Sequence, residues 1–228
     1  MTDAVVIPLV DTGSEAHVDA SFAGAAKQVS AQVIFEAGER KNYVDMDRVF
    51  ARLMLLQWIA GIVLALVVSP QTWIGDQARV HQHVWAAVIL GGLLSGLPMM
   101  LSRRHAGETL TRHVIAVVQM LWSALLIHLT GGRIETHFHV FGSLAFLAFY
   151  RDWRVIATAT LVVAADHFVR GVWWPQSVFG VAVESPFRWI EHAVWVVFED
   201  VILLRSCFRG RREAWEIAER EAQALRRQ

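Results

Sequence analysis

The pattern that decides the fold is HFHVFGSLAFLAFYRDWRVIATATLVVAADHFVRG, residues 137–171. It contains two apolar runs joined by a short segment with Arg151 and Arg154, and histidines lie at the far end of each run. The chain has six such runs, at residues 50–69, 84–101, 114–129, 138–150, 155–169 and 189–204. Several are shorter than the ~20 residues that a membrane span normally needs. Six in succession, with aromatic and charged flanks, nevertheless predict a bundle of membrane helices.

The composition supports a membrane protein. Hydrophobic residues make up 55% of the 228 residues, and the mean hydropathy of +0.39 is far from that of a water-soluble domain. The formal net charge is zero, so no basic excess suggests a nucleic-acid partner. The single cysteine, Cys207, cannot form an intramolecular disulfide. We therefore predict an all-α fold, an integral bundle of about six transmembrane helices in the lipid bilayer, with a cytoplasmic C-terminal exit helix.

The distribution of arginines predicts the orientation of the bundle. Basic residues gather after the second, fourth and sixth runs, as Arg103, Arg104, Arg112, Arg151, Arg154, Arg205, Arg209, Arg211 and Arg212. Because cytoplasmic loops of membrane proteins are enriched in Lys and Arg, both termini are expected in the cytoplasm, in a multi-pass protein of the bacterial inner membrane. The predicted parts are a cytoplasmic tail at 1–40, a six-helix membrane domain at 41–206 and the start of a signalling helix at 207–228.

Histidines collect at the opposite ends of the predicted spans. Seven of the ten lie there, namely His81, His83, His128, His137, His139, His167 and His192. Carboxylates accompany them, since Glu135, Asp166 and Glu191 each come just before one of these histidines. Polar groups within a span are costly and usually functional. The sequence therefore predicts a shared site at this end, although any one of these histidines is also typical of a helix end at a membrane interface.

The residue types in this site favour a transition metal. The candidate ligands are His137, His139, His167, His192, His83, His128, Glu191 and Asp166. Imidazoles and carboxylates suit copper(II), zinc or iron, and haem b held by two facing histidines is the alternative. His137 and His139 lie about 200° apart on a helix, which favours His139 pointing inward. We expect His139, His167 and His192 as ligands, with His137 as a fourth.

The chain continues beyond the sixth run as a charged helix. Within residues 211–228, an apolar stripe recurs at spacings of three and four residues, formed by Trp215, Ala218, Ala222 and Leu225. Such a stripe is typical of a coiled coil and predicts a weak homodimer, which would pass a displacement to an output module. A solvated surface helix is the alternative.

Two segments, HFHVFGSLAFLAFYRDWR at 137–154 and EHAVWVVFEDVILL at 191–204, resemble the multi-pass membrane input region of bacterial histidine kinases, diguanylate cyclases and chemoreceptors. The resemblance implies a sensory module whose histidines bind a ligand or cofactor, with a cytoplasmic output module as partner. A second histidine often stands in such relatives where this chain has Asp166, so a ligand set that uses both positions is altered here.

Two other classes of protein are alternatives to the sensor. A membrane metalloenzyme of the di-iron type is disfavoured because its HxxxH and HxxHH patterns do not occur. An electron or ion carrier would suit Glu199 and Asp200 in the sixth run, but it does not account for the exit helix. The sequence contains no kinase, cyclase or chemoreceptor output motif.

Overall fold

The computed structural model describes residues 12–74, 76–180 and 187–227. The chain divides into two compact units, which are described separately. The first, here called the membrane unit, is Glu39–Arg211. The second, the end unit, combines Met1–Gly38 with Arg212–Gln228.

Helices make up most of the described chain. They are α1 (Thr12–Val68), α2 (Gln82–Arg104), α3 (Thr109–Leu129), α4 (Ile134–Leu147), α5 (Trp153–Trp173), α6 (Gln176–Phe179), α7 (Arg188–Leu225) and the 3-10 turn η1 (Ala148–Tyr150). Except for Ser69, which follows the end of α1, every residue of the predicted apolar runs lies within helical structure, so the predicted helical class is confirmed. One element was not predicted from the sequence, an antiparallel hairpin of β1 (Gln71–Ile74) and β2 (Gln77–Val80), in which Trp73 lies opposite Ala78.

Four of the described helices are long and apolar enough to cross a membrane. They are Ser30–Val68 within α1, then α2, α3 and α5. The other two predicted spans, α4 and α7, are not among these four helices, and the physical reason is different for each. α4 has only 14 residues, which is about 21 Å of helix. The apolar part of α7 is interrupted by Glu191, Glu199 and Asp200.

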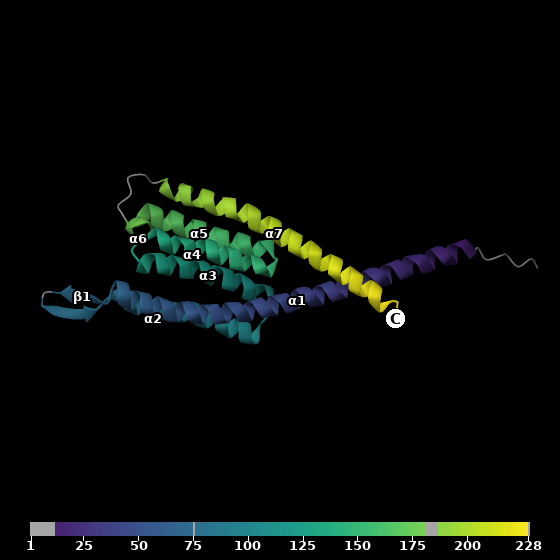
Figure 1. The fold of residues 1–228 in the computed structure, drawn as a ribbon, viewed down its shortest axis with the longest axis horizontal. Coiled ribbons are helices and arrows are strands. Elements are labelled where there is room, and N and C mark those ends of the chain that lie inside the picture. The colour runs from purple at the N-terminus through teal and green to yellow at the C-terminus, as the bar shows by residue number, and fades with distance from the viewer. Residues whose placement is uncertain (1–11, 75, 181–186, 228) are drawn as a thin grey trace, which may run out of the picture. The chain divides into compact units, whose positions relative to one another are not determined.

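The centre of the membrane unit is α3, which packs beside α2, α4 and α5 (Figure 1). Its Trp122 is fully buried and donates a hydrogen bond to Ser95 of α2, whose hydroxyl in turn donates to the Met54 carbonyl of α1. Glycines make room for the indole, because a Cβ on Gly91 would lie 2.8 Å from Trp122. Small residues on α1 and α2 therefore allow close packing around one large side chain.

The two ends of the membrane unit differ in character. At the end where α4 begins, here called the histidine end, lie the last turns of α3 and α5 and the first turns of α2 and α7. At the other, the arginine end, Asp47 of α1 is fully buried. Its carboxylate accepts hydrogen bonds from the Tyr150 hydroxyl and from the Gly107 backbone N–H, both at 2.7 Å. Asp47 thus joins α1 to η1 and to the loop between α2 and α3.

Replacing Asp47 by Ala is expected to lower the free energy of unfolding by about 2 kcal/mol, because the Tyr150 hydroxyl and the Gly107 N–H lose their acceptor. Thermal unfolding in detergent, followed by circular dichroism, measures the change. Asp45→Ala is the matched control, since Asp45 is exposed on the same helix and should change stability by less than ~0.5 kcal/mol. Equal losses of stability in both variants would show that the buried hydrogen bonds of Asp47 contribute nothing to the free energy of unfolding.

The end unit pairs the two ends of the described chain. Residues 12–38 of the predicted tail are helical and form the first part of α1. Phe35 packs edge-on against Trp215 of α7, with ring centroids 5.4 Å apart. Ala31, Ala218 and Ala222 are all buried, and Figure 1 shows the end of α7 against α1. Most of the stripe predicted to pair with a second copy is therefore covered within the same chain.

Candidate functional site

Three histidines from three helices meet at the histidine end. His137 of α4, His167 of α5 and His192 of α7 have ring centroids 5.2 Å (137 to 192), 5.6 Å (137 to 167) and 5.7 Å (167 to 192) apart. His137 and His167 are buried, with 5% and 6% of their surface exposed. These three residues are here called the histidine cluster, and they are distant in sequence but adjacent in the fold.

Each ring of the histidine cluster is held in the same way by its own helix. The Nδ1 atoms of His137, His167 and His192 lie 2.9, 3.1 and 3.3 Å from the backbone carbonyl oxygens four residues earlier. A carbonyl oxygen only accepts, so each Nδ1 is the donor. In the neutral imidazole the lone pair is then on Nε2. The three rings thus share one tautomer and present the nitrogen that binds metals.

The Nε2 nitrogen of His137 affects the stability of the fold. Its Nε2 is buried and has no hydrogen-bond partner among the described residues. A buried acceptor without a partner costs roughly 1–3 kcal/mol, so leaving this atom unbound lowers the stability of the fold. An external group that binds Nε2 would remove that cost.

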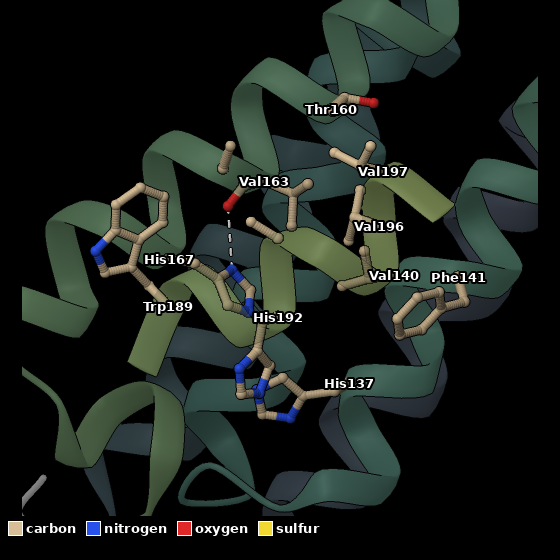
Figure 2. A pocket seen from close by; sticks show the side chains of 12 residues that line it. His137, Val140, Phe141, Thr160, Val163, His167, Trp189, His192, Val196 and Val197 are labelled. Atoms are coloured by element: carbon tan, nitrogen blue, oxygen red, sulfur yellow. Dashed lines mark hydrogen bonds between the residues drawn. The ribbon is translucent and has the colours of Figure 1, made fainter. Parts of the chain in front are cut away.

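A small apolar cavity adjoins the histidine cluster. Its volume is about 60 Å³, and Val140, Val163, Val196 and Val197 form much of its wall. Figure 2 shows the three imidazoles grouped at one end of this pocket, with the valines beyond them and Thr160 at the far end. The wall excludes water from one side of the rings, which favours direct ligand binding over solvation.

The spacing of the rings is close to that of a metal site. Three imidazoles that bind one tetrahedral ion through nitrogens at about 2.1 Å have ring centroids roughly 5 Å apart. The observed separations of 5.2 to 5.7 Å are slightly longer. As the side chains stand, no group of three or more His, Cys, Asp or Glu in the described ranges could hold a metal ion. The rings would have to rotate to bring their Nε2 atoms onto one ion.

Asp166 lies beside the histidine cluster, and its carboxylate is already hydrogen-bonded to another side chain. Its carboxylate accepts two hydrogen bonds from Arg170, at 2.8 and 2.6 Å, and lies 3.4 Å from Nδ1 of His167. Arg170 also donates to the Ser177 hydroxyl. Asp166 is therefore placed to orient His167 through its Nδ1 side rather than to act as a ligand itself.

The structure separates His83 and His128 from the histidine cluster. They form a second group, with ring centroids 5.0 Å apart, and His81 lies 4.4 Å from His83. His128 also contacts Trp174 and shares a hydrogen bond with Ser177. His81 accepts a hydrogen bond from the His83 backbone as the N-cap of α2. The ring contacts thus place these histidines in two groups, and the role of His83 and His128 as ligands stays a prediction.

His139 is also placed elsewhere. Its Nε2 lies 2.9 Å from the Gln57 amide nitrogen of α1, and its Nδ1 lies 2.8 Å from the Ser123 hydroxyl of α3. The prediction that His139 points inward holds, but its neighbours are α1 and α3. His137 points inward as well, because α4 has neighbouring helices on both of its sides. The angle of about 200° between the two residues therefore keeps neither of them out of the interior.

Contacts between α7 and the rest of the membrane unit follow one narrow stripe. Beyond His192 the buried residues of the described α7 in this unit are Val196, Asp200 and Cys207. Asp200 accepts a hydrogen bond of 2.6 Å from Thr160 of α5, a partner that the sequence pattern did not reveal. Glu191 is exposed at the rim of a groove between α4 and α7 and is not part of the cluster. His192 is therefore one of several contacts that hold α7, together with the packing of Trp189 on Phe168 and of Leu203 and Leu204 on the core.

Comparison with known proteins gives one informative similarity. No family model matches the chain, and no solved structure matches it. The chain is 31% identical over 100 residues, or 43% of its length, to "Transducer protein Htr8" of Halobacterium salinarum. The match covers only 15% of that transducer. With the four apolar helices, this similarity supports a membrane protein with a role in signal transduction, in line with the predicted resemblance to sensory input regions.

Proposed function

We propose that this chain is the input module of a membrane signalling protein and that it binds a transition metal through His137, His167 and His192. The observation that supports this most directly is the shared tautomer of the three rings, which leaves the Nε2 lone pairs free on three rings whose centroids lie 5.2 to 5.7 Å apart. Backbone carbonyls hold the opposite nitrogens, as is usual for metal-binding histidines. Membership of a sensory protein is supported by the transducer similarity.

Zinc, copper(II) or iron fits this ligand set best, since it has imidazole nitrogens and no thiolate or thioether. Three protein ligands leave one position of a tetrahedral ion open. Haem b is the alternative, because two facing histidines suffice for it and the open groove between α4 and α7 that His137 and His192 line has a volume of about 620 Å³, whereas the cavity beside the three rings has only about 60 Å³. His139, His83, His128 and Glu191 are not ligands in this proposal.

A metal in this site would act on α7. The ion would join His192 to α4 and α5 at the point where α7 begins its course through the membrane unit. Because α7 is held by one stripe of contacts, a new bond at its first turn would change its tilt or its depth. The helix continues without interruption to Leu225, so the change would reach the cytoplasmic partner, a signalling output module.

The proposal places the chain in the bacterial inner membrane with six spans and both termini in the cytoplasm. The arginines that gather at one end of the bundle support this orientation. α4 would cross a locally thinned bilayer together with η1, at a modest cost for each ångström of mismatch. α7 would cross with Asp200 turned toward Thr160 and away from lipid.

A fusion experiment tests the proposed function. Residues 1–228 are joined to the catalytic core of a histidine kinase, and the autophosphorylation rate is measured in nanodiscs with Zn²⁺, with Cu²⁺ and with chelator. Coupling between two sites is typically 5–150-fold, so a change of at least ~5-fold is expected with one of the metals. The His192→Ala fusion should not respond, whereas the His139→Ala fusion should. A His192→Ala fusion that responds as fully as the parent would refute the proposal.

A further inference from the structure

The end unit contains a contact that bears on how the exit helix is used. Ala218 and Ala222 of α7 are 2% and 1% exposed, although they lie in a strongly charged segment where a lone helix would leave them open to water. Phe35 of α1 packs against Trp215 one turn earlier. Ala31, also buried, lies one turn from Phe35 on the same helix. The α1 segment therefore covers the stripe of α7.

The covered stripe is the same one that is suited to pair with a second copy of the chain. Trp215, Ala218 and Ala222 follow the three- and four-residue spacing of a coiled-coil seam. One stripe cannot pack against α1 and against a second α7 at the same time. The two arrangements are thus mutually exclusive, and their relative stabilities decide which one is populated.

We infer that the α1 segment of the end unit, with Ala31 and Phe35 in the contact, is an intramolecular cover that keeps the exit helix from pairing with a second copy. The small side chains suit such a cover, because alanines allow close approach but bury little apolar surface, so the contact is weak enough to be released. Leu225 of α7, on the same stripe, remains exposed at 58% and would become buried in the paired state. This inference rests on the proposed signalling role of α7 but not on metal binding.

The test uses the full chain with Cys207→Ser and Ala222→Cys, in detergent micelles. Two rates are measured, maleimide labelling of the thiol introduced at position 222 and formation of an interchain disulfide through it. The cover predicts slow labelling and little disulfide. Ala31→Glu places a charge in the buried contact on the α1 side only, and it should raise both rates at least ~10-fold, which corresponds to about 1.4 kcal/mol. Val33→Glu, at an exposed position of the same helix, should change neither.

Three results would overturn the cover. Fast labelling of the introduced thiol in the chain without Ala31→Glu would show that the stripe is not covered. Fast labelling in Ala31→Glu without an interchain disulfide would show that uncovering does not lead to pairing. An equal effect of Val33→Glu would show that the added charge acts without regard to the contact.

A parallel series with His192→Ala separates this inference from the proposed metal site. The cover predicts the same protection of the thiol at position 222 and the same release by Ala31→Glu in that series. If Zn²⁺ or Cu²⁺ fails to bind the parent chain while these labelling results hold, the metal site is wrong and the cover stands.

Discussion

Replacing His137, His167 or His192 by Ala is expected to lower the affinity of the purified chain for Zn²⁺ or Cu²⁺ at least ~100-fold. Partners that only orient a ligand contribute about 10–100-fold to metal affinity, so loss of one of three ligands should cost no less. The factor of ~100 corresponds to about 2.7 kcal/mol. Competition with a chromophoric chelator in nanodiscs measures the affinity.

His139→Ala is the sharpest control for this result. His139 lies two residues from His137 on the same helix, but it bonds to Gln57 and Ser123 instead of joining the histidine cluster. Its substitution should leave metal affinity within ~3-fold of the parent while lowering stability by about 1–3 kcal/mol, since buried polar partners are left unpaired. A large loss of metal affinity in His139→Ala, with none in His192→Ala, would support the ligand set expected from the sequence. It would refute the ligand set derived from the structure.

Gly132→Ala is expected to destabilise the histidine end by about 3 kcal/mol or more, through backbone strain and overpacking together. Gly132 has a φ of +77°, and a Cβ there would lie 2.7 Å from the Val178 carbonyl oxygen. The overlap would push α6 away from the loop between α3 and α4. Because Phe179 of α6 packs against His192, with centroids 5.2 Å apart, metal affinity should fall as well.

Gly131→Ala provides the matched comparison for this glycine. Gly131 also has a positive φ, of +68°, but nothing lies within 4 Å of a Cβ placed on it. It should therefore show only the backbone strain, about 1–2 kcal/mol. Thermal unfolding of the two variants measures the difference. Equal losses of stability would mean that the close approach of α6 to Gly132 does not contribute to the fold.

Periodicity and charge predicted the helices well, because an apolar run in a membrane protein has few other ways to satisfy its backbone. They predicted less about the site. That His167 and His192 belong together followed from their common position at helix ends. Whether His137 or His139 lies with them did not follow from the sequence, because it depends on which helices flank α4. That is a property of tertiary packing.

Two other elements were beyond a pattern-based prediction. The β1–β2 hairpin has only four residues in each strand, too few for a clear alternation of apolar and polar positions. The helix at residues 12–38 lacks a strong apolar stripe of its own, and its pairing with Trp215, Ala218 and Ala222 joins segments from opposite ends of the chain. Contacts between such distant segments are not encoded in local sequence.

The most direct test of the central proposal is X-ray absorption at the metal edge of the wild-type chain, loaded with Zn²⁺ or Cu²⁺ in nanodiscs and freed of excess ion. The proposal predicts one ion for each chain, with three imidazole nitrogens at about 2.0–2.1 Å in the case of zinc. It also predicts that an imidazole is lost from this shell in His192→Ala. No stoichiometric metal with either ion, or a bound ion whose ligands are unchanged in that variant, would contradict it.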